Sequence, residues 1–211
     1  MRQPAGLSTR KQVMQLLKTN GELSAKDLTE YLHITGMAVR RHLDTLERDG
    51  LIESRAVRQA MGRPTALYRL TSAADNHFPK KYDTVALDLL GELAQEAGPE
   101  MVNHLFDRRK ESLYNKYSPA MSDRKWTDQV ETLAQIQNDN GYMVELEQVS
   151  DEEFVLKEYN CPISQLANQY HHACQCELGL FENLLNANVT RHECLADGDQ
   201  KCAYVIKKRS E

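Results

Sequence analysis

Five cysteines, all beyond residue 160, are the residues of this chain whose types and spacing could do chemistry. They are Cys161, Cys174, Cys176, Cys194 and Cys202. Their spacing matches neither the paired CxxC of a zinc ribbon nor the tight cysteine run of a ferredoxin. Clustered soft thiolates in a reducing compartment nevertheless favour an iron-sulfur cluster or zinc. A thiol or disulfide switch, and a plain role as small buried hydrophobes, are the alternatives.

The elements that carry these cysteines decide which of them can meet. We expect Cys161 just after a strand, Cys174 at the junction of two helices and Cys202 at the start of the last strand. Cys174 and Cys176 point about 200° apart on a helix, so they cannot both face one metal unless the helix starts after them. Cys194 and Cys202 flank a turn, and they share a sheet face if the loop is residues 198–200 but not if it is 198–199. Cys194 is therefore a conditional fourth ligand.

Two histidines, His171 and His172, adjoin Cys174. They are further ligand candidates, although ordinary exposed histidines are more common at such positions. The same trio could also activate a thiolate for a thiol-dependent enzyme fused to a DNA-binding domain. No third orienting group or phosphate-cradling loop accompanies them, so we expect no enzymatic activity.

The N-terminal part of the chain has the pattern of a winged helix-turn-helix. Ser24 and Asp27 have the form of a capping box, which predicts a helix that starts at residue 25 and ends near residue 33. Thr35 is a second N-cap candidate, and Gly50 is the expected stop of the helix that follows. Residues 51–58 and 67–70 alternate as two strands around a predicted turn at residues 61–64.

This order of elements is what reading a DNA major groove requires. Outward residues of the second helix can reach base edges, and arginines on a wing can reach the backbone or minor groove. A solvated helical hairpin followed by an unrelated β-hairpin is the alternative. The candidate DNA-binding residues are Ser24, Thr35, Met37, Arg40, Arg41, Arg55, Arg58 and Arg63.

Several strings in this region resemble a known group of bacterial regulators. They are residues 38–43, Leu46, residues 49–52, residues 62–64 and residues 68–71. They are similar to DeoR- or ArsR-like winged helices, and most of all to the repressor family of the suf iron-sulfur assembly operon (SufR-like). By this resemblance Cys161, Cys174 and Cys202 would hold a cluster whose state sets DNA affinity. Residues 197–199 and 202–204 also look like that family's C-terminal motif. The three matching cysteines do not identify a fourth ligand.

Charge is divided between the two parts of the 211-residue chain. Residues 1–72 hold 12 Lys and Arg against 7 Asp and Glu, which leaves 14 against 24 for the remainder. A basic N-terminal region is thus joined to an acidic remainder of the chain. The acidic part should repel DNA and so confine DNA binding to one face of the protein. No stretch approaches the roughly 20 apolar residues of a membrane span, and no segment resembles a signal peptide. We expect a cytoplasmic protein that does not bind membranes.

The remaining periodicity predicts an α+β fold in three parts. Residues 1–72 form the winged helix-turn-helix domain. Residues 73–140 form a linker and helical region, with helices at 84–97, 100–117 and 123–138 and breaks at 98–99 and 118–119. Residues 141–211 form a small cysteine-bearing sensor domain with an antiparallel sheet, in the order β-β-α-α-β-β.

Together these patterns predict a dimeric transcriptional repressor of double-stranded DNA operators, with iron-sulfur or redox sensing at the C-terminal cysteines. Palindromic half-sites require a protein dyad, so the helical region is the expected homodimer contact, with an intramolecular core as the alternative. A second hypothesis gives the C-terminal domain a small organic effector or zinc. Its aromatic lining would be Trp126, Tyr142, Phe154, Tyr159 and Tyr170.

Overall fold

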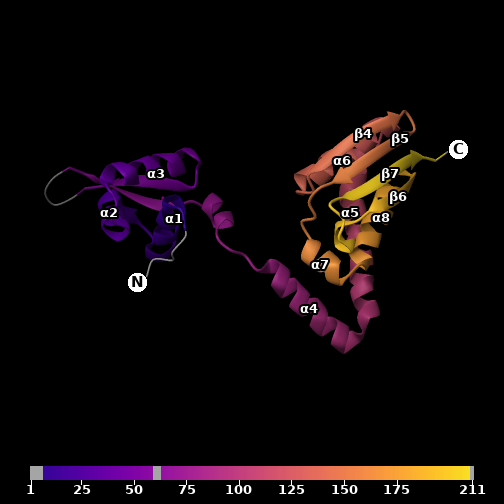
Figure 1. Ribbon diagram of the computed structural model, residues 1–211, viewed down its shortest axis with the longest axis horizontal. Coiled ribbons are helices and arrows are strands. Elements are labelled where there is room, and N and C mark those ends of the chain that lie inside the picture. The colour runs from indigo at the N-terminus through magenta and orange to yellow at the C-terminus, as the bar shows by residue number, and fades with distance from the viewer. Residues whose placement is uncertain (1–6, 59–62, 210–211) are drawn as a thin grey trace. The chain divides into compact units, whose positions relative to one another are not determined.

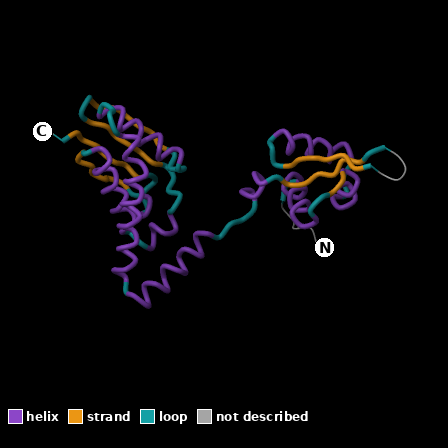
Figure 2. The backbone as a smooth tube through the Cα atoms, turned by 180° about the vertical axis from the view of Figure 1, so that it is seen from behind, coloured by secondary structure: helices purple, strands orange, loops and turns teal. Residues whose placement is uncertain are grey.

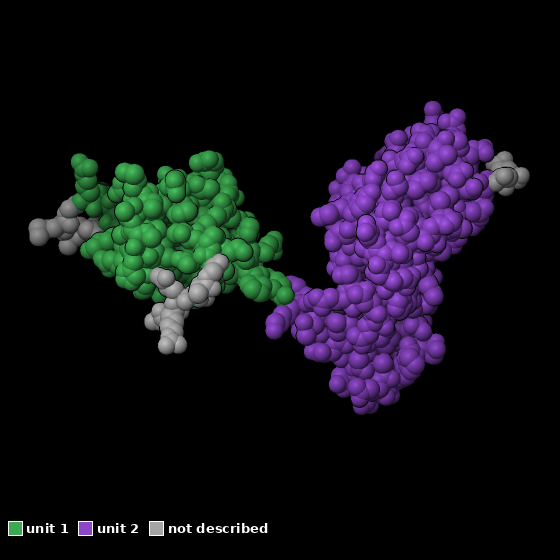
Figure 3. All heavy atoms as spheres, in the orientation of Figure 1, with its two compact units in different colours: residues 1–80 green, residues 81–211 purple. Residues whose placement is uncertain are grey.

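The computed structural model describes residues 7–58 and 63–209, and the chain divides into two compact units, residues 1–80 and 81–211 (Figure 3). Each unit has a hydrophobic core of its own. The helices of the region expected at residues 84–138 fall within the second unit, together with the C-terminal sheet. None of the helices in the described ranges combines the length and hydropathy that a membrane span requires.

The first unit contains three helices and a three-stranded antiparallel sheet (Figure 1). The helices are α1 (Thr9–Asn20), α2 (Ala25–Leu32) and α3 (Gly36–Arg48). The strands are β1 (Leu23–Ser24), β2 (Ile52–Val57) and β3 (Thr65–Leu70), in the order β1-β3-β2. The two predicted strands are confirmed, while the short strand β1, which pairs with β3, was not expected. The predicted turn at 61–64 lies partly outside the described residues.

Local capping explains where the helices begin. The Ser24 hydroxyl accepts a hydrogen bond from Asp27 N, and the Asp27 carboxylate accepts one from Ser24 N, which completes the predicted capping box. Thr35 Oγ1 accepts from Ala38 N at the start of α3. Gly50 adopts φ 70° directly after α3, a conformation that glycine tolerates best. These features set where α2 and α3 begin and where α3 ends.

The segment expected as a linker is partly folded. A 3₁₀ helix spans Ser72–His77, and Ala74 is fully buried in the first core. Asp75 accepts a hydrogen bond from Lys18 Nζ at 2.9 Å, which ties this segment to α1. The ordered first unit therefore extends past residue 72.

The second unit begins with α4 (Tyr82–Ala97), α5 (Pro99–Met121) and α6 (Trp126–Asp139). The predicted break at 98–99 is confirmed, but the break predicted at 118–119 is wrong because α5 runs through Pro119 to Met121. Pro119 lies in the final turn, where only one hydrogen bond near the helix end is lost. A proline this close to the end of a helix does not break it.

A four-stranded antiparallel sheet completes the second unit, in the order β4-β5-β7-β6. Its strands are β4 (Val144–Ser150), β5 (Glu153–Glu158), β6 (Ala187–Glu193) and β7 (Cys202–Lys208). Between β5 and β6 lie α7 (Ser164–Gln169) and α8 (His172–Leu185), and a 3₁₀ turn, η2, spans Leu195–Asp197. The α+β prediction is confirmed.

Helices α5, α6 and α8 lie on one face of this sheet (Figure 1, Figure 2). Alternate residues of β5 enter the interior, and Phe154 and Leu156 are buried there against the helices. Glu158 continues the same alternation and is 1% exposed. The sheet thus carries a carboxyl group into the interior at the end of β5.

Candidate functional site

Four of the five cysteines gather at one end of the sheet, and we call Cys161, Cys174, Cys194 and Cys202 the cysteine site. They come from four places in the fold: between β5 and α7, the first turn of α8, the residue after β6 and the first residue of β7. Cys174, Cys194 and Cys202 are buried members of one core cluster, and Cys161 packs against it half-buried. All four residues therefore belong to, or pack against, one core cluster at this end of the sheet.

Cys194 is the central member of the cysteine site. Its sulfur lies close enough to Cys174 to contribute, after burial, to the raised pKa of that thiol. It contributes in the same way to the raised pKa of Cys161 and Cys202. In addition, Leu195 N donates a hydrogen bond to Cys202 Sγ at 3.4 Å. The conditional fourth ligand therefore lies among the three cysteines that the sequence singled out.

The turn between β6 and β7 brings Cys194 and Cys202 together. The sheet pairs Glu193 with Ala203 after a bulge, and extending that register by one residue sets Cys194 opposite Cys202 on the same face. Both tight loops considered from the sequence are wrong, because residues 195–201 include a 3₁₀ turn. The Asp199 carboxylate holds this turn by accepting a hydrogen bond from Cys194 N at 2.8 Å.

Cys176 lies apart from the cysteine site. Both it and Cys174 are on α8, and Cys176 packs in a separate cluster with Val102, Phe106 and Ala173. The prediction that Cys174 and Cys176 face different ways is confirmed by their membership of different clusters.

Burial determines the protonation of the cysteine site. It raises the pKa of Cys161 to about 11 and the pKa of Cys174 and Cys202 to about 12. These groups are therefore neutral thiols near pH 7 until a cation replaces their protons. The thiol-enzyme hypothesis needs the opposite, a lowered pKa at Cys174. His171 and His172 contact Asp197 and Asp107 respectively, at 3.5 and 3.2 Å.

The donor set of the cysteine site suits a cluster of several metal ions better than a single zinc. A tetrahedral zinc with Zn–S bonds near 2.3 Å sets its sulfur atoms roughly 3.8 Å apart. Within the described part of the chain, no three of these sulfur atoms lie within 4.8 Å of one another. A multi-iron cluster accepts more widely spaced thiolates, and cysteine thiolates are the ligands it uses.

Two carboxyl groups adjoin the cysteine site and were missed in the sequence. Glu158 pairs with Cys202 across the sheet and accepts a hydrogen bond from Gln137 Nε2 at 2.9 Å, and burial raises its pKa to about 9. Glu177 on α8 accepts a hydrogen bond from Tyr204 OH at 2.9 Å, and burial raises its pKa too. The alternation of buried residues along β5 was the sequence signal for Glu158, because Glu158 follows Phe154 and Leu156 at the same two-residue spacing.

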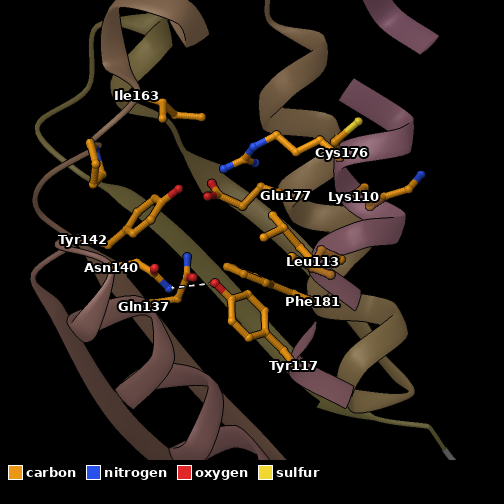
Figure 4. Close-up of a pocket in the computed structure, with 13 residues that line it drawn as sticks. Lys110, Leu113, Tyr117, Gln137, Asn140, Tyr142, Ile163, Cys176, Glu177 and Phe181 are labelled. Atoms are coloured by element: carbon orange, nitrogen blue, oxygen red, sulfur yellow. Dashed lines mark hydrogen bonds between the residues drawn. The ribbon is translucent and has the colours of Figure 1, made fainter. Parts of the chain in front are cut away.

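A cavity of about 200 Å³ opens beside Glu177 between α5 and α8 (Figure 4). Tyr117 and Tyr142 point into it, and Asn140 Nδ2 donates to Tyr117 OH at 3.1 Å. Of the five aromatic residues predicted to line an effector pocket, Tyr142 lines this cavity. Trp126 and Phe154 instead pack edge to face in the core, with ring centroids 5.6 Å apart.

The predicted DNA-reading residues lie on the first unit. Met37, Arg40 and Arg41 are exposed on α3, and Thr35 caps that helix. On the wing side, Arg58 and Arg63 are exposed.

Two of the predicted contacts already have partners within the first unit. Ser24 is buried with its hydroxyl bonded to Asp27, so its side chain positions α2 and is not free to meet DNA. Arg55 is exposed but makes an ion pair with Glu22, with Arg55 Nε 2.9 Å from Glu22 Oε1. A DNA contact by Arg55 would have to compete with this pair.

Comparison with known proteins agrees with this description of the first unit. A family model described as "HTH domain" matches residues 9–59. The match covers helices α1, α2 and α3 and strand β2, which form a helix-turn-helix domain. With the sheet formed by β1, β2 and β3 it is a winged helix, the DNA-binding module of transcriptional regulators. No curated protein matches the chain.

Solved structures with partial similarity include three regulators. The reduced form of the transcriptional regulator YodB from B. subtilis is 18% identical over 44% of this chain and 85% of its own, with a TM-score of 0.29. A mutant of ZitR from Lactococcus lactis is 22% identical over 43% and 74%, with a TM-score of 0.28. The phenol-responsive sensory domain of the activator PoxR, solved with phenol, is 13% identical over 80% and 89%, with a TM-score of 0.45. At these scores none of the three carries an argument about function.

Proposed function

We propose that the protein is a dimeric repressor whose affinity for its DNA operator depends on an iron-sulfur cluster held by Cys161, Cys174, Cys194 and Cys202. The observation that carries this proposal is the central position of Cys194, whose thiol interacts with those of the other three cysteines. The likeness of the sequence to the SufR-like repressors supports the same assignment. When bound, such a cluster supplies one-electron redox chemistry and a covalent link between four separate segments of the chain.

The homodimer is supported by an apolar stripe on α4. Tyr82, Val85 and Leu89 follow one another at helical spacing and are 75%, 54% and 66% exposed. Their neighbours Leu90 and Leu93 pack against the rest of the second unit, so the stripe borders a surface that is already folded. We infer that α4 of a second subunit covers this stripe. A protein that binds two symmetric half-sites needs a two-fold axis between its subunits.

A chain of contacts leads from the cysteine site to this stripe. Cys161 lies two residues before Ile163, and Ile163 and Tyr170 flank α7 and pack against the same buried cluster as Leu90 and Leu93 of α4. Helices α4 and α7 are in contact. Helix α7 also contacts η2, which follows Cys194. Release of Cys161 and Cys194 from a shared ligand would loosen α7, and with it the support of α4. The two subunits would then present their α3 helices to DNA differently.

Arg191 assists the cysteine site from β6. Its Nη1 donates a hydrogen bond to the carbonyl oxygen of Cys174 at 3.0 Å, and its charge faces the thiols of Cys174 and Cys194. A fixed cation at this point offsets part of the negative charge that four thiolates accumulate on ligation. Arg191 therefore holds the first turn of α8 and favours the ligated state.

Anaerobic purification followed by an absorbance spectrum and assays of iron and acid-labile sulfide tests the cofactor. The expected protein is brown and contains both elements. Cys174→Ser should lose the colour, whereas Cys176→Ser, a matched change on the same helix outside the cysteine site, should keep it. A wild-type protein that stays colourless after anaerobic reconstitution, or that contains only zinc, would contradict the iron-sulfur assignment and leave DNA binding intact.

The cavity beside Glu177 supports a second candidate function, the sensing of a small polar effector. Its volume of about 200 Å³ lies below the roughly 300–1,000 Å³ of drug-sized sites, so only a small molecule fits. The Tyr142 hydroxyl and the Glu177 carboxyl, whose pKa burial raises, would supply hydrogen bonds. A metabolite that changes the DNA affinity of metal-free protein, with loss of this response in Tyr142→Phe, would favour this function.

A further inference from the structure

A second set of metal-ligand residues lies outside the cysteine site, where α5 meets α8. Asp107 comes from α5, and His172 and Cys176 lie four residues apart on one face of α8. Their ligand atoms all lie within 4.8 Å of one another, and this is the only such group of three in the described ranges of the chain. We propose that Asp107, His172 and Cys176 form a binding site for a single zinc-like divalent ion, separate from the cysteine site.

The distances within this group match those of a tetrahedral zinc site. His172 Nε2 lies 3.2 Å from Asp107 Oδ2, and Cys176 Sγ lies 3.4 Å from Asp107 Oδ1. Zinc bonds of about 2.0–2.2 Å to nitrogen and oxygen and 2.3 Å to sulfur set such pairs roughly 3.4 and 3.6 Å apart. The three side chains therefore need only small shifts to share one ion. A mixed nitrogen, oxygen and sulfur set suits zinc or cobalt and is a poor match for the hard cations magnesium and calcium.

The imidazole of His172 points independently to a ligand. Its Nε2 atom is buried and makes no hydrogen bond, although Asp107 Oδ2 lies 3.2 Å away. Its other ring nitrogen, Nδ1, lies 3.3 Å from Gln175 Oε1. A metal-bound histidine donates its second ring N–H to such an oxygen, which leaves the lone pair of the first nitrogen free for the ion. Gln175 thus selects the tautomer that a metal needs.

The charges around the group also allow a divalent ion. The Asp107 carboxylate and a Cys176 thiolate together neutralise two positive charges, and His172 adds none when neutral. In the structure Lys110 Nζ occupies part of this position, 3.3 Å from Asp107 Oδ1. Figure 4 shows Lys110 and Cys176 together at one end of the cavity, into which the lysine can turn when an ion arrives. Three protein ligands leave a fourth position for water.

Such an ion would clamp α5 to α8. The same two helices carry Phe106 and Ala173, which pack against Leu93 and Ala94 of α4. The site therefore controls the rigidity of the support beneath α4 and is independent of the ligands in the cysteine site.

Titration with Co²⁺ as the probe tests this site on the full chain carrying Cys174→Ser, which disables the cysteine site. We expect one equivalent of Co²⁺ to give tetrahedral visible bands and a near-ultraviolet thiolate band. Adding Cys176→Ser should remove the thiolate band, and His172→Gln should weaken binding at least tenfold. Circular dichroism of each variant reports whether it is folded.

The result has two informative forms. Tetrahedral and thiolate bands that persist in both folded variants would overturn the proposal. So would an aqueous Co²⁺ spectrum from the chain in which Asp107, His172 and Cys176 are all intact. Either result would reduce these three residues to an ordinary ion pair with a nearby thiol. Since neither iron nor DNA enters the measurement, failure here leaves the proposed repressor function untouched.

Discussion

The side chains of Cys174 and Cys194 lie close together in the core of the second unit, although one is in the first turn of α8 and the other follows β6. Two neighbouring buried thiols can share a metal, and they can be oxidised to a disulfide. Since Cys194 also interacts with Cys161 and Cys202, this pair is the nucleus of the cysteine site.

Replacement of Cys194 by serine should therefore have the same effect as replacement of Cys174. We expect loss of bound iron and sulfide in Cys194→Ser, because the central ligand is removed while the small polar side chain still fits. Iron content per chain, measured beside Cys176→Ser, checks this. Full iron content in Cys194→Ser would mean that another group, such as the nearby Glu158, supplies the fourth ligand.

The exposed arginines of α3 should carry operator recognition. We expect Arg40→Ala or Arg41→Ala to weaken specific binding by about 1–3 kcal/mol if the side chain reads a base, and to weaken all sequences alike if it meets a phosphate. Fluorescence anisotropy with operator and unrelated DNA at several salt concentrations separates these cases. Lys18→Ala is the control, because Lys18 pairs with Asp75 away from α3. An unchanged affinity in both arginine variants would remove α3 from the interface.

The apolar stripe on α4 should hold the dimer together. Leu89→Glu places a charge where the proposed contact excludes water, so we expect dissociation to monomers in sedimentation velocity experiments. The exposed residue Gln95 lies elsewhere on the same helix, and Gln95→Glu adds the same charge there. Equal sedimentation of the two variants would show that subunits meet elsewhere. Leu89 is 66% exposed in the single chain, so its loss should not unfold the second unit.

The buried Glu158 should make stability depend on pH. Burial raises its pKa to about 9, far above the value of an unfolded chain near 4.3, so the native state binds the extra proton between these values. Its contribution is complete below the unfolded pKa and is lost as pH rises towards 9, with a slope of at most about 1.4 kcal/mol per pH unit. Gln137, Glu177 and Cys202 face it.

Urea unfolding at pH 6 and pH 8 checks this dependence. Glu158→Gln, which keeps the neutral shape, should lose less stability than the wild type between the two pH values. The control Glu152→Gln changes an exposed carboxyl in the β4–β5 turn and should behave like the wild type. Equal losses in Glu158→Gln and the wild type would show that Glu158 is ionised in the native state.

Local patterns predicted much of the fold. The capping box of Ser24 and Asp27 and the glycine stop at Gly50 act over a few residues, so they are legible in a sequence. The run of α5 through Pro119 was missed because tolerance of a proline depends on how much helix remains after it. The alternation of β5 already contained Glu158, but the polar residue was not followed into the interior.

The candidate site was predictable only in part. The sequence grouped Cys161, Cys174 and Cys202 because each is expected at the end of a helix or strand. It did not decide whether Cys194 is a fourth ligand. That choice depends on a bulge in β6 and on the Asp199 carboxylate binding Cys194 N, neither of which periodicity reveals. Asp107 and His172 lie on different helices and are 65 residues apart in the sequence, so no local pattern predicts their contact.

Operator affinity measured on one anaerobic sample before and after removal of its iron tests the proposed regulation most directly. The wild type should bind operator DNA at least tenfold more weakly once the iron is removed, whereas Cys174→Ser should be weak throughout and insensitive to the treatment. Equal operator affinity of the wild type with and without iron would contradict control of DNA binding by the cysteine site.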